Sequence, residues 1–372
     1  MNDPDGVGTV DHASSAVRLT SLPTRGVLAL ILSLASISLS IAGLLEFDAS
    51  ITRFVRSLND VQQDHLHDLW LARLSDFGDQ VGKGQSLIAV SVALLALGYA
   101  FALPLWKSAG WQTLWAHALA GAGNNLLKHL IGRARPKFMH AGSPEFAPLS
   151  GSGWDSFPSG HSMASFAVAI VLAVRFPRIR WFLVPLAMAV AVSRVVRGSH
   201  FLTDVTAGAV LGCWVGMVAA HPWKQWRESL ESALAMTAPA VVALLALVWT
   251  IGLPVSDAWA ASALVNGGLV IALAAVVAHV LVVTRAAIVP PWLTRSTIEG
   301  LLGLGIGSFS GSVWVAVAAL LVCVAHWIRP RPDDGTAGVS TVAVWLQEGV
   351  IVLGVLVGLV VMAELRGALP MR

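Results

Sequence analysis

The stretch SRVVRGSHFLTD, residues 193–204, lies between the apolar runs WFLVPLAMAVAV (181–192) and AGAVLGCWVGMVAA (207–220). It places two arginines, a histidine and an aspartate where the chain otherwise reads as membrane-spanning. Charged groups at membrane depth are costly and usually belong to a functional site, whereas charges near a helix end also serve as membrane anchors. The rest of the sequence decides between these two roles.

The composition indicates an all-α, polytopic membrane protein. Of the 372 residues, 56% are hydrophobic and only 12% are charged, whereas soluble domains carry about 25% charged residues. The net charge of +3 gives no indication of nucleic-acid binding. The expected partner is therefore the lipid bilayer, and the oligomeric state is left open.

Runs of about 20 apolar residues predict ten membrane-spanning helices. They cover residues 26–45, 86–106, 111–131, 159–175, 181–197, 202–222, 235–255, 261–283, 305–328 and 343–364. Between the first two runs, residues 46–83 predict an amphipathic helix lying on the membrane, and residues 132–158 form a loop rich in Gly, Pro and Ser. The predicted organisation is a disordered cytoplasmic tail (1–25), a core of six spans (26–223) and a C-terminal region with about four spans (224–372).

The distribution of Lys and Arg predicts the orientation. One face carries the basic residues Arg18, Arg25, Lys107, Arg175, Arg178, Arg180, Lys224 and Arg227. The positive-inside rule makes this face cytoplasmic, which predicts a multi-pass inner-membrane protein with a cytoplasmic N-terminus. The opposite face still carries Arg133, Arg135, Lys137, Arg194 and Arg197. Anchoring does not explain a cationic cluster on the translocated side.

Three clusters are predicted to meet at that outer face, because an odd span ends on the side where the next span begins. The third span ends with KHLIGRARP (128–136), the fourth begins with PSGH (158–161), and the stretch 193–204 joins the fifth to the sixth. If the third helix continues, Lys128 and Arg135 stand on one face about 10.5 Å apart along its axis, although Pro136 favours a helix end near Arg135. Ser159 and Gly160 are expected to offer unpaired backbone N–H groups at a helix start.

These residue types predict a phosphate site with a nucleophile. Lys128, Arg135 and Arg194 supply cationic donors for a tetrahedral anion, and the N–H groups around Gly160 add to the cradle. His200 can attack phosphorus, held in one tautomer by Asp204 four residues later on the same helix face. His161 can protonate the leaving alkoxide. No acidic or Cys/His cluster has metal-ligand spacing, so neither a metal nor another cofactor is expected.

The three segments resemble the ordered signatures of the type 2 phosphatidic acid phosphatase (PAP2) superfamily, K-x6-RP, PSGH and SR-x5-H-x3-D. That superfamily includes membrane lipid phosphatases and the vanadium haloperoxidases. The resemblance covers residues 26–222 and implies a six-helix core, metal-free catalysis and a site at the outer leaflet. It implies that the catalytic residues are His200, His161 and Asp204, and that the phosphate-binding residues are Lys128, Arg135, Ser159, Gly160 and Arg194.

The favoured interpretation is a lipid phosphate or diphosphate phosphatase that works through a phosphohistidine at the periplasmic or exterior face. Its substrate, for example phosphatidic acid or undecaprenyl diphosphate, is not determined by the motifs. A phosphotransferase that passes the group to another lipid, for example lipid A, has the same motifs. A haloperoxidase is disfavoured because those relatives are soluble. An anion transporter is disfavoured because its site is expected near mid-membrane.

Overall fold

The chain folds into α-helices, as predicted. The computed structural model describes residues 22–62, 69–138, 146–150, 153–284, 290, 293–329 and 341–368. Within them lie twelve α-helices and isolated β-bridges but no strand: α1 (Leu22–Gln62), α2 (Leu69–Gly82), α3 (Gly84–Ala100), α4 (Pro104–Ile131), α5 (Gly160–Arg175), α6 (Arg180–Val196), α7 (Leu202–Ala220), α8 (Trp226–Gly252), α9 (Trp259–Val283), α10 (Arg295–Phe309), α11 (Val313–Ile328) and α12 (Thr341–Glu364). Residues 1–21 of the predicted tail lie outside the described residues.

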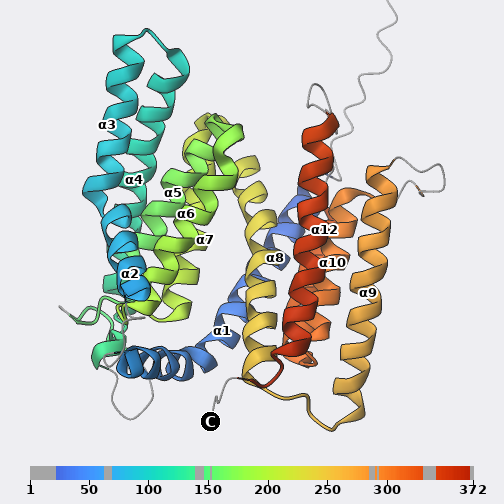
Figure 1. The fold of residues 1–372 in the computed structure, drawn as a ribbon. Coiled ribbons are helices and arrows are strands. Elements are labelled where there is room, and N and C mark those ends of the chain that lie inside the picture. The colour runs from blue at the N-terminus through green and yellow to red at the C-terminus, as the bar shows by residue number, and fades with distance from the viewer. Residues whose placement is uncertain are drawn as a thin grey trace, which may run out of the picture.

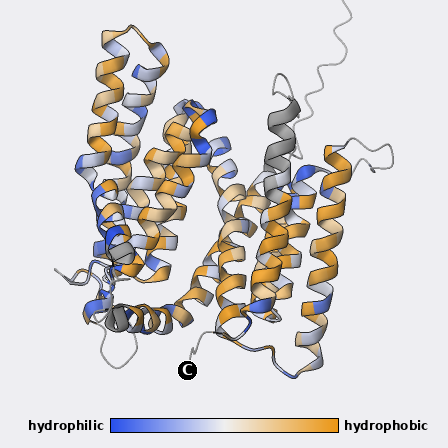
Figure 2. Ribbon diagram, in the orientation of Figure 1, coloured by the Kyte–Doolittle hydropathy of each residue, from blue (hydrophilic) through white to orange (hydrophobic). Residues whose placement is uncertain are grey.

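Most helices are apolar along their length, and hydrophilic residues gather near helix ends and at α2 (Figure 2). Five helices in the described part of the chain are long and apolar enough to cross a bilayer, and a sixth span results if α2 and α3, which meet at a 54° bend, are counted together. This is fewer than the ten full-length spans predicted. Each predicted run except one nevertheless has nearly all of its helical residues in a single helix.

The exception is the run 305–328, for which the prediction of one span is wrong. The chain turns at Ser310–Ser312, where Gly311 has a φ of +77°, and the Ser312 side chain caps α11 by accepting a hydrogen bond from the Val315 N–H. Ser296 near the start of α10 donates to the carbonyl of His326 near the end of α11, at 3.1 Å. The two helices therefore form an antiparallel hairpin.

The segment 46–83 also differs from the single surface helix that was predicted. Its first part belongs to α1, which turns across the lower end of the neighbouring helices in Figure 1. Its last part is α2, which packs against α6. A Cβ added to Gly78 would lie 2.1 Å from Ser193 Oγ, so only glycine permits this approach. Helix α2 is therefore packed on the helix bundle.

Helices α5 and α7 form the tightest part of the bundle that carries the three motifs. Gly208, Gly212 and Gly216 recur at four-residue spacing along α7, and a Cβ on each would lie 2.4–2.6 Å from a backbone oxygen of the α5 segment. Small residues at this spacing let two membrane helices approach closely. Their contact fixes the start of α5 against the start of α7.

Helix α1 joins this bundle to the C-terminal helices. It packs mainly against α8 and α11, where Ser36 Oγ donates to the Ala318 carbonyl at 2.8 Å and Leu44 is fully buried with Leu245. The domain boundary after residue 223 stays a prediction. The first predicted span, which lies in α1, packs mainly on helices of the C-terminal region.

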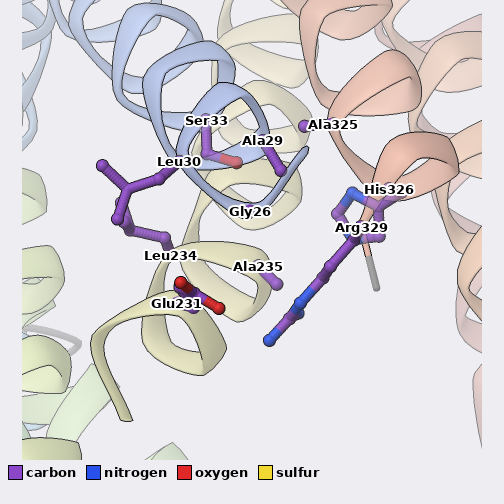
Figure 3. A pocket seen from close by; sticks show the side chains of 10 residues that line it. All are labelled: Gly26, Ala29, Leu30, Ser33, Glu231, Leu234, Ala235, Ala325, His326 and Arg329. Atoms are coloured by element: carbon purple, nitrogen blue, oxygen red, sulfur yellow. The ribbon is translucent and has the colours of Figure 1, made fainter. Parts of the chain in front are cut away.

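At the end of the molecule opposite the motifs, α1, α8 and α11 enclose a small pocket (Figure 3). Glu231 and Arg329 lie on opposite sides of it, next to Gly26 and His326. Its free volume is about 10 Å³, which is room for about one water molecule. The pocket is too small for a lipid or a cofactor.

Candidate active site

The structure brings the three motifs together at the lower end of the bundle in Figure 1, where α4 and α6 end and α5 and α7 begin. Lys128 and Arg135 come from the end of α4 and the loop after it, and His161 comes from the first turn of α5. Arg194 lies in the last turn of α6, and His200 precedes α7. The site is therefore assembled from helix ends and short loops.

Lys128 and Arg135 meet at one carboxylate, but not on one helix. Helix α4 ends at Ile131, because Gly132 adopts a left-handed φ of +60° and a Cβ there would lie 1.9 Å from the Ala147 carbonyl oxygen. The helix therefore ends where the predicted span 111–131 ends, and the conditional placement of Lys128 and Arg135 on one helix face does not apply. The chain turns back, so that Arg135 donates to Asp155 through Nε at 2.8 Å and Nη2 at 2.6 Å. Lys128 Nζ lies 3.7 Å from the same carboxylate.

Asp155 is a site residue that the sequence analysis missed. Hydrogen bonds from Arg135 hold the pKa of this carboxyl well below its usual range, and Asp155 in turn raises the pKa of Arg135. Backbone pairing sets the position of Asp155, since Ser156 N–H donates to the Arg133 carbonyl at 3.0 Å and Arg135 N–H donates to the Gly153 carbonyl at 3.2 Å. The only sequence signal was an acid close before PSGH.

The start of α5 offers amide donors, but not the pair that was expected. Ser159 is the N-cap, and its own N–H donates to the Asp204 carbonyl at 3.0 Å. Its side chain accepts from the Ser162 N–H. The expectation of an unpaired Ser159 amide is therefore wrong, because α7 provides its acceptor. Within the described residues the Gly160 and His161 amides have no hydrogen-bond partner, and they are the donors that a helix N-terminus presents to an anion.

His200 is buried, with only 3% of its surface exposed, and its ring is oriented by a backbone carbonyl. Nδ1 lies 2.8 Å from the Ser156 carbonyl oxygen. Because a carbonyl only accepts, Nδ1 must carry the proton and Nε2 keeps its lone pair. Burial lowers the pKa of His200, which favours this neutral form. The geometry gives the tautomer that a nucleophilic Nε2 requires.

Asp204 lies beside His200 but not through the helical spacing that was proposed. His200 precedes α7, so the two residues do not share a helix face. The nearer Asp204 oxygen is 3.6 Å from His200 Nδ1, and it accepts hydrogen bonds from Ser156 Oγ at 2.5 Å and the Phe201 N–H at 2.9 Å. Asp204 therefore supplies a nearby negative charge, and the Ser156 carbonyl holds the tautomer.

A fully buried arginine fixes Asp204 in place. Arg133 donates to Asp204 at 2.6 Å through Nη1 and to Asp48 of α1 at 2.7 Å through Nη2. Its guanidinium carbon also lies 4.2 Å from the ring centre of Phe201, and Thr203 donates to Asp48. In the sequence, Arg133 is one of the predicted outer-face cations and has no predicted role of its own. It is the central cation of a buried Asp48–Arg133–Asp204 group.

Arg194 and His161 meet a second carboxylate that the sequence analysis missed. Asp79 of α2 accepts a hydrogen bond from Arg194 Nη1, and the same oxygen lies 3.6 Å from His161 Nε2. Lys83 and Arg197 approach the other oxygen at 3.5 and 3.7 Å. Arg194 Nε and His161 Nε2 are both buried and have no hydrogen-bond partner among the residues that the structure describes. They therefore retain the capacity to contact a bound anion.

An apolar groove of about 300 Å³ begins beside this cluster. Gln80 and Val81, next to Asp79, lie at one part of it, and Leu172 and Leu183 lie farther along α5 and α6 from the site. It is lined by Gln80, Val81, Ser86, Leu87, Val90, Ser165, Val168, Ala169, Leu172, Leu183, Leu186, Ala187 and Val190. The groove therefore extends from the polar site between the membrane-facing helices.

Comparison with known proteins gives related sequences. The rhizobial lipid A 1-phosphatase of Rhizobium johnstonii is 44% identical over 98 residues, which are 26% of this chain and 40% of that protein. Phosphatidylglycerophosphatase B of Bacillus subtilis is 36% identical over 107 residues, 24% of this chain and 45% of that protein. The chain thus matches less than half the length of these two relatives. No solved structure matches it.

A third relative is covered over most of its length. Decaprenylphosphoryl-5-phosphoribose phosphatase of Mycobacterium tuberculosis is 32% identical over 151 residues, which are 39% of this chain and 74% of that protein. The family model described as PAP2 superfamily matches residues 109–229, the segment that carries all three motifs. With its helical, membrane-spanning fold and the motif residues gathered at one end of α4–α7, the chain belongs to the PAP2 superfamily.

Proposed function

We propose that this protein is an integral-membrane phosphatase that hydrolyses the phosphomonoester or diphosphate headgroup of a lipid through a phosphohistidine on His200. The observation that carries the proposal is that a buried His200, whose Nε2 keeps its lone pair, lies in the same site as the cations Lys128, Arg135 and Arg194. A dianionic phosphate needs such cations, and a nitrogen nucleophile needs a free lone pair.

In the first step, the cations and the Gly160 and His161 amides hold the phosphate. His200 Nε2 forms a bond to phosphorus while the bond from phosphorus to the leaving oxygen breaks. His161 gives its proton to that oxygen, which departs as the lipid alcohol or the lipid monophosphate. Asp204 lies close enough to Nδ1 to balance the positive charge that His200 gains.

In the second step, water replaces the lipid product. His161, now neutral, accepts a proton from water as its oxygen attacks phosphorus. The N–P bond breaks, its electron pair returns to His200 Nε2, and inorganic phosphate leaves. Both histidines are then back in their starting protonation states, with His161 protonated and His200 neutral. Among the described residues no group of three or more His, Cys, Asp or Glu has metal-binding geometry, and the mechanism assigns the charge stabilisation to Lys and Arg.

A lipid substrate is supported by the apolar groove beside the site and by the names of the relatives, which are phosphatases of lipid A, phosphatidylglycerophosphate and decaprenylphosphoryl-5-phosphoribose. We place the protein in the inner cell membrane with a cytoplasmic N-terminus and a periplasmic or exterior site. This orientation rests on the Lys and Arg distribution.

The test is phosphate release by the purified full-length protein from phosphatidic acid, phosphatidylglycerophosphate, undecaprenyl diphosphate and lipid A, without an acceptor lipid. We expect release from at least one of them in excess EDTA, with inhibition by vanadate. Vanadate resembles the five-coordinate state of phosphorus. Activity that is lost in EDTA and restored by magnesium contradicts the mechanism, and transfer only in the presence of an acceptor lipid identifies a phosphotransferase.

Asp155→Asn is expected to tighten the binding of vanadate by about tenfold, which corresponds to about 1.4 kcal/mol. Asp155 occupies Arg135 through two hydrogen bonds and lies near Lys128, so a bound anion competes with it. The inhibition constant of vanadate gives the measurement. Weaker binding in the variant means that Asp155 chiefly positions the two cations.

Val90→Trp is expected to raise the KM for a long-chain lipid phosphate severalfold and to leave turnover of p-nitrophenyl phosphate unchanged. Val90 of α3 lines the groove and is 43% exposed, so a larger side chain fits without disrupting the core. Val92→Trp is the matched control, because Val92 lies on the same helix, is 52% exposed and does not line the groove. Equal kinetics for the two variants contradict a role of this groove in binding the lipid chain.

A further inference from the structure

Asp79 lies outside the segment that matches the PAP2 family, yet it reaches the centre of the site. It belongs to α2, before the bend into α3, whereas the family model begins at residue 109. Its carboxylate is 19% exposed. One oxygen accepts from Arg194 and lies 3.6 Å from His161 Nε2. A residue of a helix outside the three motifs thus contacts a phosphate-binding arginine and approaches the general acid.

The close packing of α2 on α6 and α5 allows Asp79 to reach Arg194 and His161. Gly78 and Gly82 flank Asp79 on the side of α2 that faces α6 and α5. A Cβ on Gly82 would lie 2.6 Å from Val190 Cγ1 and 3.0 Å from His161 Cδ2, and a Cβ on Gly78 would collide with Ser193. Any larger residue at either position would hold the helix away from the site. The two glycines let the intervening carboxylate reach Arg194 and His161.

The charges around His161 determine how easily its imidazole holds a proton, and the contact with Asp79 bears on this directly. Three groups that are positively charged, or become so on protonation, act on the His161 ring: Arg194 of α6, Lys128 of α4 and His200 before α7. Among the described residues, Asp79 is the only carboxylate within ion-pair distance of the His161 ring. A general acid has to hold a proton before it can donate one, and a nearby carboxylate favours the protonated imidazole over the neutral one.

We propose that Asp79 is a positioning residue of the phosphatase reaction, which favours the protonated form of His161 over the neutral form for proton transfer to the leaving oxygen. The proposal rests on the proposed function. It also makes α2 a required part of the site, since the carboxylate is delivered by its close packing on α6. Because Asp79 is an anion in an anion site, it supports proton transfer while weakening phosphate binding.

The experiment compares full-length Asp79→Asn with wild type on an alkyl lipid phosphate and on p-nitrophenyl phosphate between pH 5 and 9. On the alkyl substrate we expect kcat to fall by about 10- to 100-fold at neutral pH, a part of the roughly 10²–10⁴-fold that general acid catalysis supplies. The alkaline limb of the kcat profile is expected to move to lower pH. On p-nitrophenyl phosphate, whose leaving group needs no proton, kcat should change by less than about threefold.

Asp76→Asn is the matched control. Asp76 lies on the same helix and is 80% exposed, and its one ion pair among the described residues is with Arg197 at 3.4 Å, so this variant should behave as wild type on both substrates. Vanadate inhibition reports whether Asp79→Asn is folded, and it should be at least as strong as in wild type. Equal losses on both substrates, or weaker vanadate binding, overturn the proposal in favour of a structural role. A wild type that releases no phosphate refutes the proposed function itself, and so the two failures are distinguishable.

Discussion

His200→Ala is expected to abolish turnover and the trapped phosphoenzyme together. Removal of the nucleophile in a covalent mechanism costs roughly 10⁴-fold or more in kcat, because the remaining groups still bind the substrate but have no atom to transfer it to. Brief incubation with ³²P-labelled substrate and alkaline quenching, which preserves phosphohistidine, measures the intermediate. Wild type should carry the label and His200→Ala should not.

His161→Ala separates the two histidines. It should be slow on an alkyl phosphate and recover substantially on p-nitrophenyl phosphate, since only the alkoxide needs a proton. It should still form the labelled intermediate from the aryl substrate. Label trapped on His161 in the His200→Ala protein would mean that the two roles are reversed.

The pH dependence of the nucleophile follows from its burial. His200 attacks only when neutral, and burial lowers its pKa from the ordinary 6.5. A lowered pKa keeps the neutral form populated as the pH falls, so the acid limb of kcat/KM should lie below pH 6.5. An acid limb above pH 6.5 contradicts the buried, neutral His200.

The residues whose position at the site could be predicted from the sequence are those that belong to short local motifs. Lys128, His161, Arg194 and His200 each lie at the end of an apolar run, so membrane topology alone places them on one face. The start of α5 was predicted from PSGH for the same reason. The local pattern could not predict the hydrogen-bond partner of each group, because these partners lie on other elements. The Ser159 N–H donates to a carbonyl of α7, and His200 donates to a carbonyl of the loop before α5.

Asp79, Asp155 and Asp48 were missed because their roles depend on long-range contacts. Asp48 is separated by 85 residues from Arg133, and Asp79 by 115 from Arg194. In the sequence these acids are not distinguishable from other polar residues of the predicted amphipathic segment 46–83 or of the loop 132–158. The span 305–328 was wrong for a different reason. Its glycines fit the apolar average of a helix, although Gly311 and the serines beside it make a turn.

Arg133→Met is expected to destabilise the protein by about 3–5 kcal/mol, the usual cost of removing one partner from a buried ion pair. Arg133 is fully buried and stands between Asp48 and Asp204, which are also fully buried. Methionine replaces the length of the side chain but not its charge, so two carboxylates would remain in an apolar setting without their cation. The unfolding free energy in detergent micelles, measured with increasing denaturant, gives the effect.

Two further variants test whether the loss comes from the ion pairs. Lys137→Met removes a cation from the same loop, where Lys137 is exposed and lies over the ring of Phe138, and should change stability by less than about 0.5 kcal/mol. Asp48→Asn leaves Arg133 paired with Asp204 and should be less damaging than Arg133→Met. An Arg133→Met protein as stable as Lys137→Met would contradict the buried ion-pair group. Because Asp48 is the only member of this group on α1, the effect of Asp48→Asn also measures how strongly α1 is coupled to Asp204.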